Sequence, residues 1–217
     1  MSRILVTGAT GFIGGHVVAA LRDGRREVIG TARGAGADAP ADLAIAAEAK
    51  TLVERVRPTA IVHAAGLRHG DKAALEAANA GTTRNLLSAA AGLSPRPRVV
   101  LVGSAAEYGR QPTAAPLAED AECRPDSPYG RAKLAATRVA LHFAGDGLDV
   151  TVLRVFNVVG PGAGGLPGAL IRRVLDTHGD REGADDPLRL AMVRDFVAIA
   201  DVVQAVRRAL DLSLIHI

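Results

Sequence analysis

The sequence predicts an α/β fold, in which helices cover both faces of a doubly wound parallel sheet. Short apolar runs alternate along the chain with longer alanine-rich segments of helical period. The apolar runs are continuous, which is typical of strands that are buried on both faces. Since parallel strands need right-handed crossover connections, this alternation favours the doubly wound arrangement.

The expected elements alternate regularly over the first 160 residues. Strands are expected at 3–8, 27–32, 60–65, 98–104 and 149–156. Helices are expected at 12–22, 46–57, 71–91 and 129–144. A proline-marked turn precedes the fourth strand, and a long loop ends at Pro128. We therefore expect residues 1–160 to form one domain.

The character of the chain changes from Gly160 onward. The stretch GPGAGGLPG indicates a linker. A helix near 169–177, a short apolar run at 188–197 and a helix near 202–212 follow, which is too little for an independent core. We expect residues 161–217 to be an incomplete second lobe. The ending SLIHI carries no capping signal, so we expect the chain to be truncated there or to end in residues foreign to the natural protein.

The composition indicates a soluble globular protein. The chain has 217 residues, of which 48% are hydrophobic and 23% charged, and about 70% of the unfolded surface is buried at this size. The net charge is only +3 and the arginines are scattered, so no nucleic-acid surface is expected. One cysteine, Cys123, excludes an internal disulfide. Neither a signal peptide nor a membrane span is expected, which favours a cytoplasmic protein.

A glycine-rich turn, TGATGFIG, joins the first expected strand to the first helix. Main-chain N–H groups at a helix N-terminus, with the helix dipole behind them, form a site for a pyrophosphate. The spacing is G-x-x-G-x-x-G, unlike the G-x-G-x-x-G of ordinary dinucleotide-binding dehydrogenases. The alternative is a turn that merely packs well, but its place at the first strand–helix junction favours a dinucleotide. The expected cofactor contacts are Gly8, Gly11, Phe12, Ile13 and Gly14.

The end of the second expected strand indicates which dinucleotide binds. An acidic residue there would hold the ribose 2′-hydroxyl, whereas an arginine would accommodate a 2′-phosphate. The strand ends in Ala32 and Arg33, with no acid in that place, and an arginine can donate two hydrogen bonds to phosphate. We expect NADP in preference to NAD, with a solvated Arg33 as the alternative. Asp42 and Leu43 are expected near the adenine.

Tyr129 and Lys133 lie four residues apart on an expected helix and project from one face. The ordinary pKa of tyrosine is about 10. An ammonium group about 4 Å away is worth roughly 4 kcal/mol at an effective dielectric of ~20, which would bring the phenol into range for proton transfer. Ser104 ends the fourth strand, at the edge where such sheets bind ligands. The three residues predict a catalytic set for hydride transfer, although Tyr-x-x-x-Lys alone is common by chance.

Together these motifs resemble the extended short-chain dehydrogenase/reductases of the NAD-dependent epimerase/dehydratase family, in the nucleotide-sugar branch. The resemblance runs from residue 3 to about 211, through TGATGFIGGHV, HAAG, NAGTTRNLLSAA, GSAAEYG, SPYGRAK, LRVFNVVGPG and RDFVAIADVV. It implies an NAD(P)-binding Rossmann domain over 1–160 and part of a substrate-binding lobe over 161–217. It makes Ser104, Tyr129 and Lys133 catalytic, with Lys133 also holding the nicotinamide ribose.

The resemblance implies further contacts. Ala64 and Ala65 of HAAG are assigned to the cofactor, whereas His63 is interpreted as a buried residue at a strand end. Asn157 and Arg194 match positions that contact the nucleotide-sugar in relatives. From the residues alone, Asn157 is a strand-end cap and Arg194 a surface charge. Relatives pair through helices equivalent to 71–91 and 129–144, so a homodimer is implied.

The residues after Ser104 depart from one branch of the family. The 4,6-dehydratases carry Asp-Glu directly after the catalytic Ser or Thr, where this chain has Ala105 and Ala106. Dehydration is therefore not expected. Most relatives have an apolar residue where Glu107 stands, and GS-x-x-EYG is similar to reductases of 4-keto-6-deoxy nucleotide sugars. We expect a nucleotide-sugar 4-epimerase or 4-keto reductase without a metal; the alternatives are a reductase of a non-sugar carbonyl and a non-catalytic NADP(H) sensor.

Overall fold

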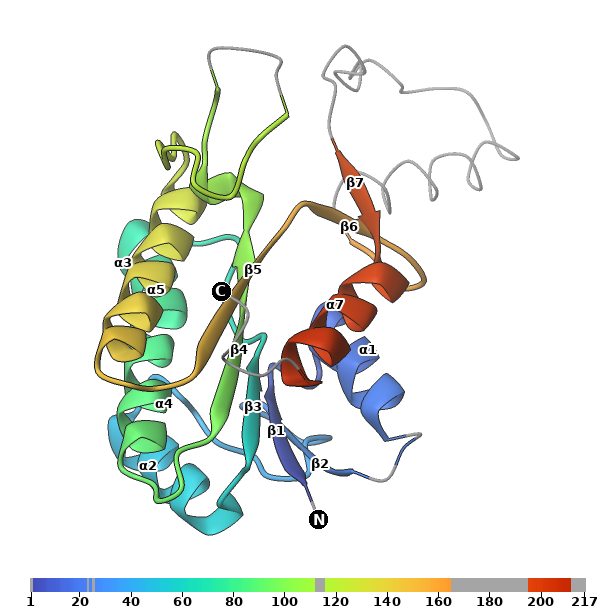
Figure 1. The fold of residues 1–217 in the computed structure, drawn as a ribbon, viewed down its shortest axis with the longest axis vertical. Coiled ribbons are helices and arrows are strands. Elements are labelled where there is room, and N and C mark those ends of the chain that lie inside the picture. The colour runs from blue at the N-terminus through green and yellow to red at the C-terminus, as the bar shows by residue number, and fades with distance from the viewer. Residues whose placement is uncertain (1, 23, 25, 112–115, 165–194, 212–217) are drawn as a thin grey trace.

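A computed structural model describes residues 2–22, 24, 26–111, 116–164 and 195–211. A five-stranded sheet of order β2-β1-β3-β4-β5 forms its centre (Figure 1). The strands are β1 Arg3–Thr7, β2 Glu27–Thr31, β3 Ala60–His63, β4 Arg98–Ser104 and β5 Val150–Val155. Every neighbouring pair in this sheet is parallel. The predicted α/β fold is confirmed.

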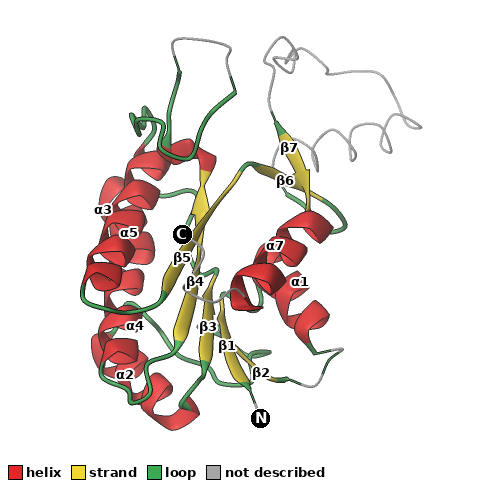
Figure 2. Cartoon of the chain, viewed as in Figure 1, coloured by secondary structure: helices red, strands yellow, loops and turns green. Residues whose placement is uncertain are grey.

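Helices cover both faces of the sheet, as Figure 2 shows. One face is covered by α1 Phe12–Leu21 and α7 Ile199–Asp211. The other is covered by α2 Ala46–Val56, α3 Lys72–Glu76, α4 Thr82–Ala91 and α5 Pro128–Gly145. None of the helices in these described ranges is long and apolar enough to cross a membrane.

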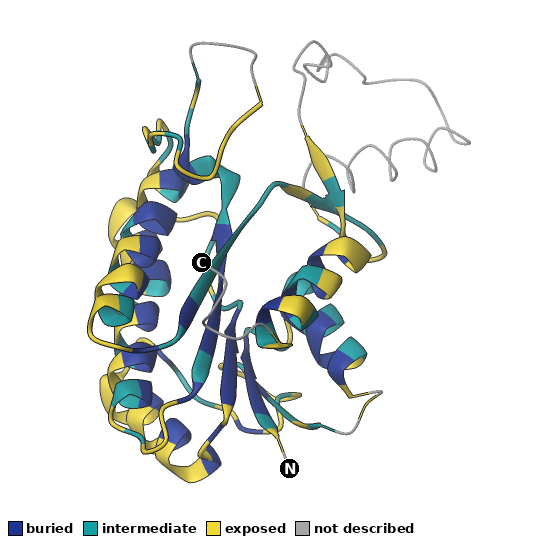
Figure 3. Ribbon diagram, in the orientation of Figure 1, coloured by how far each residue is buried: buried dark blue, intermediate teal, exposed yellow. Residues whose placement is uncertain are grey.

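Each strand contributes side chains to two apolar cores, one on each face (Figure 3). The core under α1 and α7 includes Val6, Val17, Val62 and Val206. The core under α2 and α4 includes Leu5, Leu52, Ile61, Leu86 and Leu101. Because successive side chains of a strand point to opposite faces, burial on both faces requires the continuous apolar runs seen in the sequence.

The helix expected over 71–91 is divided. The five-residue π-helical turn η1, Ala77–Gly81, separates α3 from α4. The side-chain amide of Asn79 donates to the carbonyls of Leu67 (3.0 Å) and Leu75 (2.8 Å), and the Thr83 hydroxyl donates to the Asn79 carbonyl at 2.7 Å. The bonds from Asn79 connect η1 to the loop after β3 and to the preceding helix α3.

A second, two-stranded sheet follows β5. It pairs β6 Asn157–Val159 with β7 Phe196–Ala198 in parallel. The helix expected near 202–212 begins earlier, at Ile199, and packs beside α1. The helix expected near 169–177, most of the run at 188–197 and the ending SLIHI lie outside the described residues. The domain boundary at residue 160 stays a prediction.

Candidate active site

Three predicted motifs meet at the carboxyl edge of the sheet. β1 leads into the glycine turn, β3 into HAAG, and β4 into the short helix η2, Ala105–Glu107. The chain passes from β1 to β2 on one side and later to β3 on the other side of β1, which creates a topological switch point. Ligands of open α/β sheets bind at such a point.

The glycine turn has the close packing that a dinucleotide cradle needs. A Cβ atom on Gly14 would lie 2.1 Å from the carbonyl oxygen of Gly8, so only glycine lets α1 approach the end of β1 this closely. Gly11 is the N-cap of α1 and provides no side-chain cap. The N-terminal N–H groups of this ten-residue helix therefore face the turn without a competing side chain. The predicted residues fit the pyrophosphate of NAD or NADP.

The segment after β3 lies directly against this cradle. The main-chain N–H of Ala65 donates to the Thr7 hydroxyl at 3.1 Å, which joins the segment to the end of β1. His63 is 1% exposed and contacts Thr7 (2.7 Å) and Thr83 (3.2 Å) through its two ring nitrogens. Burial, with a smaller contribution from nearby Lys133, lowers the pKa of His63 to about 3. The imidazole is therefore neutral, as suits a buried strand-end residue.

The end of β2 carries an acid that the sequence prediction missed. Asp38, on the following loop, folds back so that its carboxylate accepts from the Gly30 N–H at 2.6 Å and pairs with Arg22. The hydrogen bond from Gly30 lowers the pKa of Asp38, and Arg22 lowers it further against the opposing effect of burial. Both contacts use Oδ2 of Asp38, whose side chain remains exposed, so the expectation of no acid at this strand end is wrong. Asp38 and Arg33 are both exposed charges beside the end of β2.

The expected adenine-side residues hold their own loop together. The Asp42 carboxylate accepts from the Ala44 N–H at 3.0 Å. The main-chain N–H of Asp42 donates to the carboxylate of Glu48 at 2.7 Å. Leu43 is buried in the core on the α2 side. The contact of Asp42 and Leu43 with the adenine stays a prediction.

Ser104 and Tyr129 lie close together at the carboxyl end of β4. Ser127 accepts from the Gly130 N–H at 3.0 Å and caps α5, whose first residue is Pro128, so Tyr129 stands in the first turn. A Cβ on Gly130 would lie 2.3 Å from the Ala106 carbonyl, and this close approach brings α5 against η2. The Ser104 side chain accepts from the Ala106 N–H at 3.2 Å, and it lies near enough to the Tyr129 phenol to lower the pKa of that phenol.

Lys133 lies one helical turn further along α5 and is 6% exposed. Its ammonium donates to the carbonyl of Val102 in β4 at 2.6 Å. Burial lowers the pKa of Lys133 to about 8, against an opposing effect of Glu107. The structure therefore brings together the three residues that the sequence predicts as a catalytic set.

The pKa of Tyr129 is shifted in the direction opposite to the one that the sequence predicts. Burial raises the pKa of Tyr129, whereas the hydrogen bond with Ser104 and the charge of Arg68 lower it less. The groups that shift this pKa do not include Lys133, so the prediction that Lys133 lowers the pKa of Tyr129 is not supported. Sequence reasoning missed Arg68, although a cation shortly after HAAG was a visible signal.

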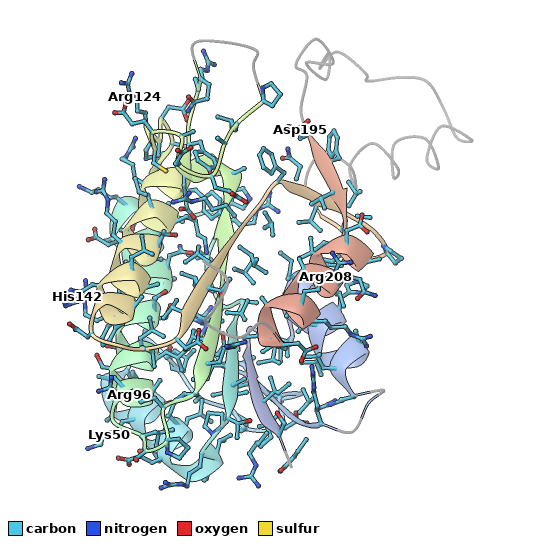
Figure 4. All side chains as sticks on the ribbon, in the orientation of Figure 1. Lys50, Arg96, Arg124, His142, Asp195 and Arg208 are labelled. Atoms are coloured by element: carbon cyan, nitrogen blue, oxygen red, sulfur yellow. The ribbon has the colours of Figure 1, made fainter. Side chains whose placement is uncertain are left out.

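The expected substrate contacts are resolved only in part. Asn157 begins β6, and its side-chain amide donates to the carbonyl of Asp195 at 2.8 Å. Figure 4 labels Asp195 at the start of β7, across from β6. Asn157 thus makes the strand-end cap that the residues alone suggest, and its contact with a nucleotide-sugar stays a prediction. Arg194 lies outside the described residues.

Comparisons with known proteins agree with this arrangement. The model of the NAD dependent epimerase/dehydratase family matches residues 4–214. A dTDP-6-deoxy-L-talose 4-dehydrogenase (NAD(P)(+)) from Kitasatospora kifunensis is 33% identical over 94% of this chain and 69% of its own length. A UDP-glucose 4-epimerase from Streptomyces lividans is 36% identical over 58% of this chain and 42% of its own length.

A solved structure supports the fold. The Thermus thermophilus UDP-glucose 4-epimerase in complex with NAD has a TM-score of 0.81 and 27% identity, over 97% of this chain and 75% of that one. The chain spans less than half of the Streptomyces relative and about two thirds of the Kitasatospora relative. The family match nonetheless covers nearly every residue given. The chain belongs to the NAD dependent epimerase/dehydratase family.

Proposed function

We propose that this chain carries the catalytic domain of an NAD(P)-dependent oxidoreductase that acts on a nucleotide-sugar, as a 4-epimerase or 4-keto reductase. The observation that carries the proposal is the close packing of α5 on η2, which puts Tyr129 beside Ser104. The buried Lys133 lies one turn further along α5 and donates to the Val102 carbonyl of β4. The 4-dehydrogenase and 4-epimerase activities of the two curated relatives support the substrate class.

The cofactor, when bound, supplies or takes up the hydride at the sugar carbon. The chain's own residues handle the proton and the developing charge. Burial keeps the Tyr129 phenol protonated at neutral pH, so it can donate its proton to the oxygen of a ketone substrate. Ser104 presents a second hydroxyl to the same oxygen. Two donors that are already in place stabilise a developing alkoxide without reorganisation.

The proposal is tested on a panel of nucleotide sugars. We expect the intact protein to oxidise or epimerise at least one UDP-, dTDP- or GDP-linked hexose or 6-deoxyhexose, with NAD⁺ or NADP⁺ supplied. Reduced cofactor is measured by absorbance, and epimers are separated by chromatography and identified by NMR. Binding of cofactor without turnover of any member of the panel would contradict the proposal and would favour a sensor.

We further propose that NADP is the preferred cofactor, because Arg33 is an exposed cation two residues after the end of β2. Replacing Arg33→Ala removes a charge-assisted hydrogen bond worth about 1.5–3 kcal/mol. The affinity for NADPH should therefore fall roughly tenfold to hundredfold, and that for NADH should barely change. Binding is followed by cofactor fluorescence, with the exposed Arg138→Ala on α5 as the matched control. A wild-type protein that binds NADH more tightly than NADPH would show that Arg33 does not select the cofactor.

A further inference from the structure

Behind Ser104 lies a fully buried carboxylate. Glu107, the last residue of η2, is 0% exposed. One of its oxygens accepts from the Ser104 N–H at 2.8 Å, and the other accepts from Nε of Arg154 at 3.0 Å. With the Ser104 side chain bonded to a main-chain N–H of η2, the two residues form a capping box. The backbone of Ser104 is thus fixed from both sides.

Arg154 extends this contact into a network. It comes from β5, and its Nη1 donates to the Tyr108 hydroxyl and to the carbonyl of Glu119, each at 3.0 Å. Its guanidinium lies 4.9 Å from the centre of the Tyr108 ring. Glu107 is therefore satisfied at both oxygens and connects β4, β5 and the loop after η2.

A capping box does not explain the charge. Glutamine serves at the third position of such a box as well as glutamate does. Burying an ion pair is seldom a net gain in stability, since desolvation offsets the attraction. Neither the capping box nor the stability of the fold therefore explains why this residue is charged. The charged groups that surround Glu107 offer an explanation.

The charged groups around Glu107 are those of the candidate catalytic set. From β5 it faces Arg154, and from α5 it faces Lys133 and Tyr129. Its charge raises the pKa of Lys133 and also that of Tyr129. Other charges act on the same two groups: His63 lies near Lys133 but is neutral, and Arg68 acts on Tyr129 from the segment after β3.

We propose that Glu107 is a positioning residue of this site, which fixes the main chain of Ser104 and supplies the negative charge that faces Lys133. The proposal rests on the proposed function for the roles of Ser104, Tyr129 and Lys133. Glu107 acts through these residues and contacts no substrate. The charge helps Lys133 to keep its proton and helps Tyr129 to remain a proton donor, as reduction of a ketone requires.

The composition makes the test unusually direct. The lysines of the chain are Lys50, Lys72 and Lys133, its tyrosines are Tyr108 and Tyr129, and it has no tryptophan. Lysine labelled at Cε therefore gives three NMR signals, of which Lys133→Met identifies one. Ionisation of the phenols can be followed by absorbance, with Tyr129→Phe to assign the transition.

In Glu107→Gln we expect Lys133 to titrate below its wild-type pKa of about 8, and Tyr129 to titrate at lower pH than in the wild type. Both shifts have the same sign because the lost charge had raised both values. For ketone reduction, the alkaline limb of the pH profile of kcat should move to lower pH, because the phenol must stay protonated to act as the donor. The kcat should fall roughly tenfold to hundredfold, a part of what general acid–base assistance is worth, with little change in KM.

Two further variants complete the test. Glu122→Gln removes an exposed carboxylate that pairs with Arg124, and should leave both titrations unchanged. Glu107→Gln combined with Arg154→Met removes both charges of the buried pair, so it should fold even where the single variant does not. The double variant should still have a lower pKa of Lys133 than the wild type.

The outcomes separate this proposal from the proposed function. An unchanged Lys133 titration in a folded Glu107 variant overturns the positioning role. A loss of kcat with no movement of the alkaline limb also overturns it, since a merely structural residue would behave that way. Shifted titrations in a protein that turns over no nucleotide sugar would support the positioning role and contradict the proposed function.

Discussion

Replacing Tyr129→Phe should abolish turnover and leave cofactor affinity nearly unchanged. The substitution keeps the ring, which packs at the start of α5, and removes only the hydroxyl that lies beside Ser104. General acid–base assistance is worth ~10²–10⁴-fold, so the loss should be at least of that order. Turnover is measured on the sugar that the wild type accepts, and NADPH binding is measured by fluorescence.

Lys133→Met serves as the comparison, because it should damage both turnover and cofactor binding. The ammonium is buried beside β4, and the resemblance to the family predicts that it would also hold the nicotinamide ribose. Thermal unfolding of both variants distinguishes a lost function from a lost fold. Undiminished activity of Tyr129→Phe would show that the proton comes from another group and that the assigned catalytic set is wrong.

The sequence predicts most of the fold because its signals are local. Continuous apolar runs mark all five strands of the central sheet, and the helix start at Phe12 follows from the glycine turn. The helix α5 begins at Pro128, one residue before the expected start. The π-helical turn at 77–81 is hidden, because the apolar pattern continues through it. The Asn79 side chain of this turn donates to the carbonyl of Leu67, a contact across 12 positions of the sequence that the local pattern does not reveal.

The candidate site is predicted less completely, because its electrostatics arise from distant contacts. The sequence spacing places Lys133 and Tyr129 on one helical face, but does not show that the ammonium bonds to Val102 in β4. Likewise, Asp38 returns to β2 across a loop, and Glu107 pairs with Arg154 from another strand. In each case the partner is fixed by the tertiary fold, so residue type and local period cannot identify it.

The protein should not act as a dehydratase. Elimination of water across C5 and C6 of a hexose needs a base for the C5 proton and an acid for the departing hydroxyl. Relatives that perform it carry both on the two residues after the catalytic Ser or Thr. In this chain those residues are Ala105 and Ala106, which form the first part of η2 and carry no titratable group.

Glu107 cannot replace the two missing acids. Its carboxylate is fully buried and already accepts from the Ser104 N–H and from Arg154. Each missing group is worth ~10²–10⁴-fold, so elimination should be negligible beside hydride transfer. The intact protein is incubated with GDP-mannose and with dTDP-glucose, each with added cofactor, and the products are examined for the loss of one water by mass spectrometry. Formation of a 4-keto-6-deoxy sugar at an ordinary enzymatic rate would overturn this prediction, because it would require an acid and a base that neither alanine supplies.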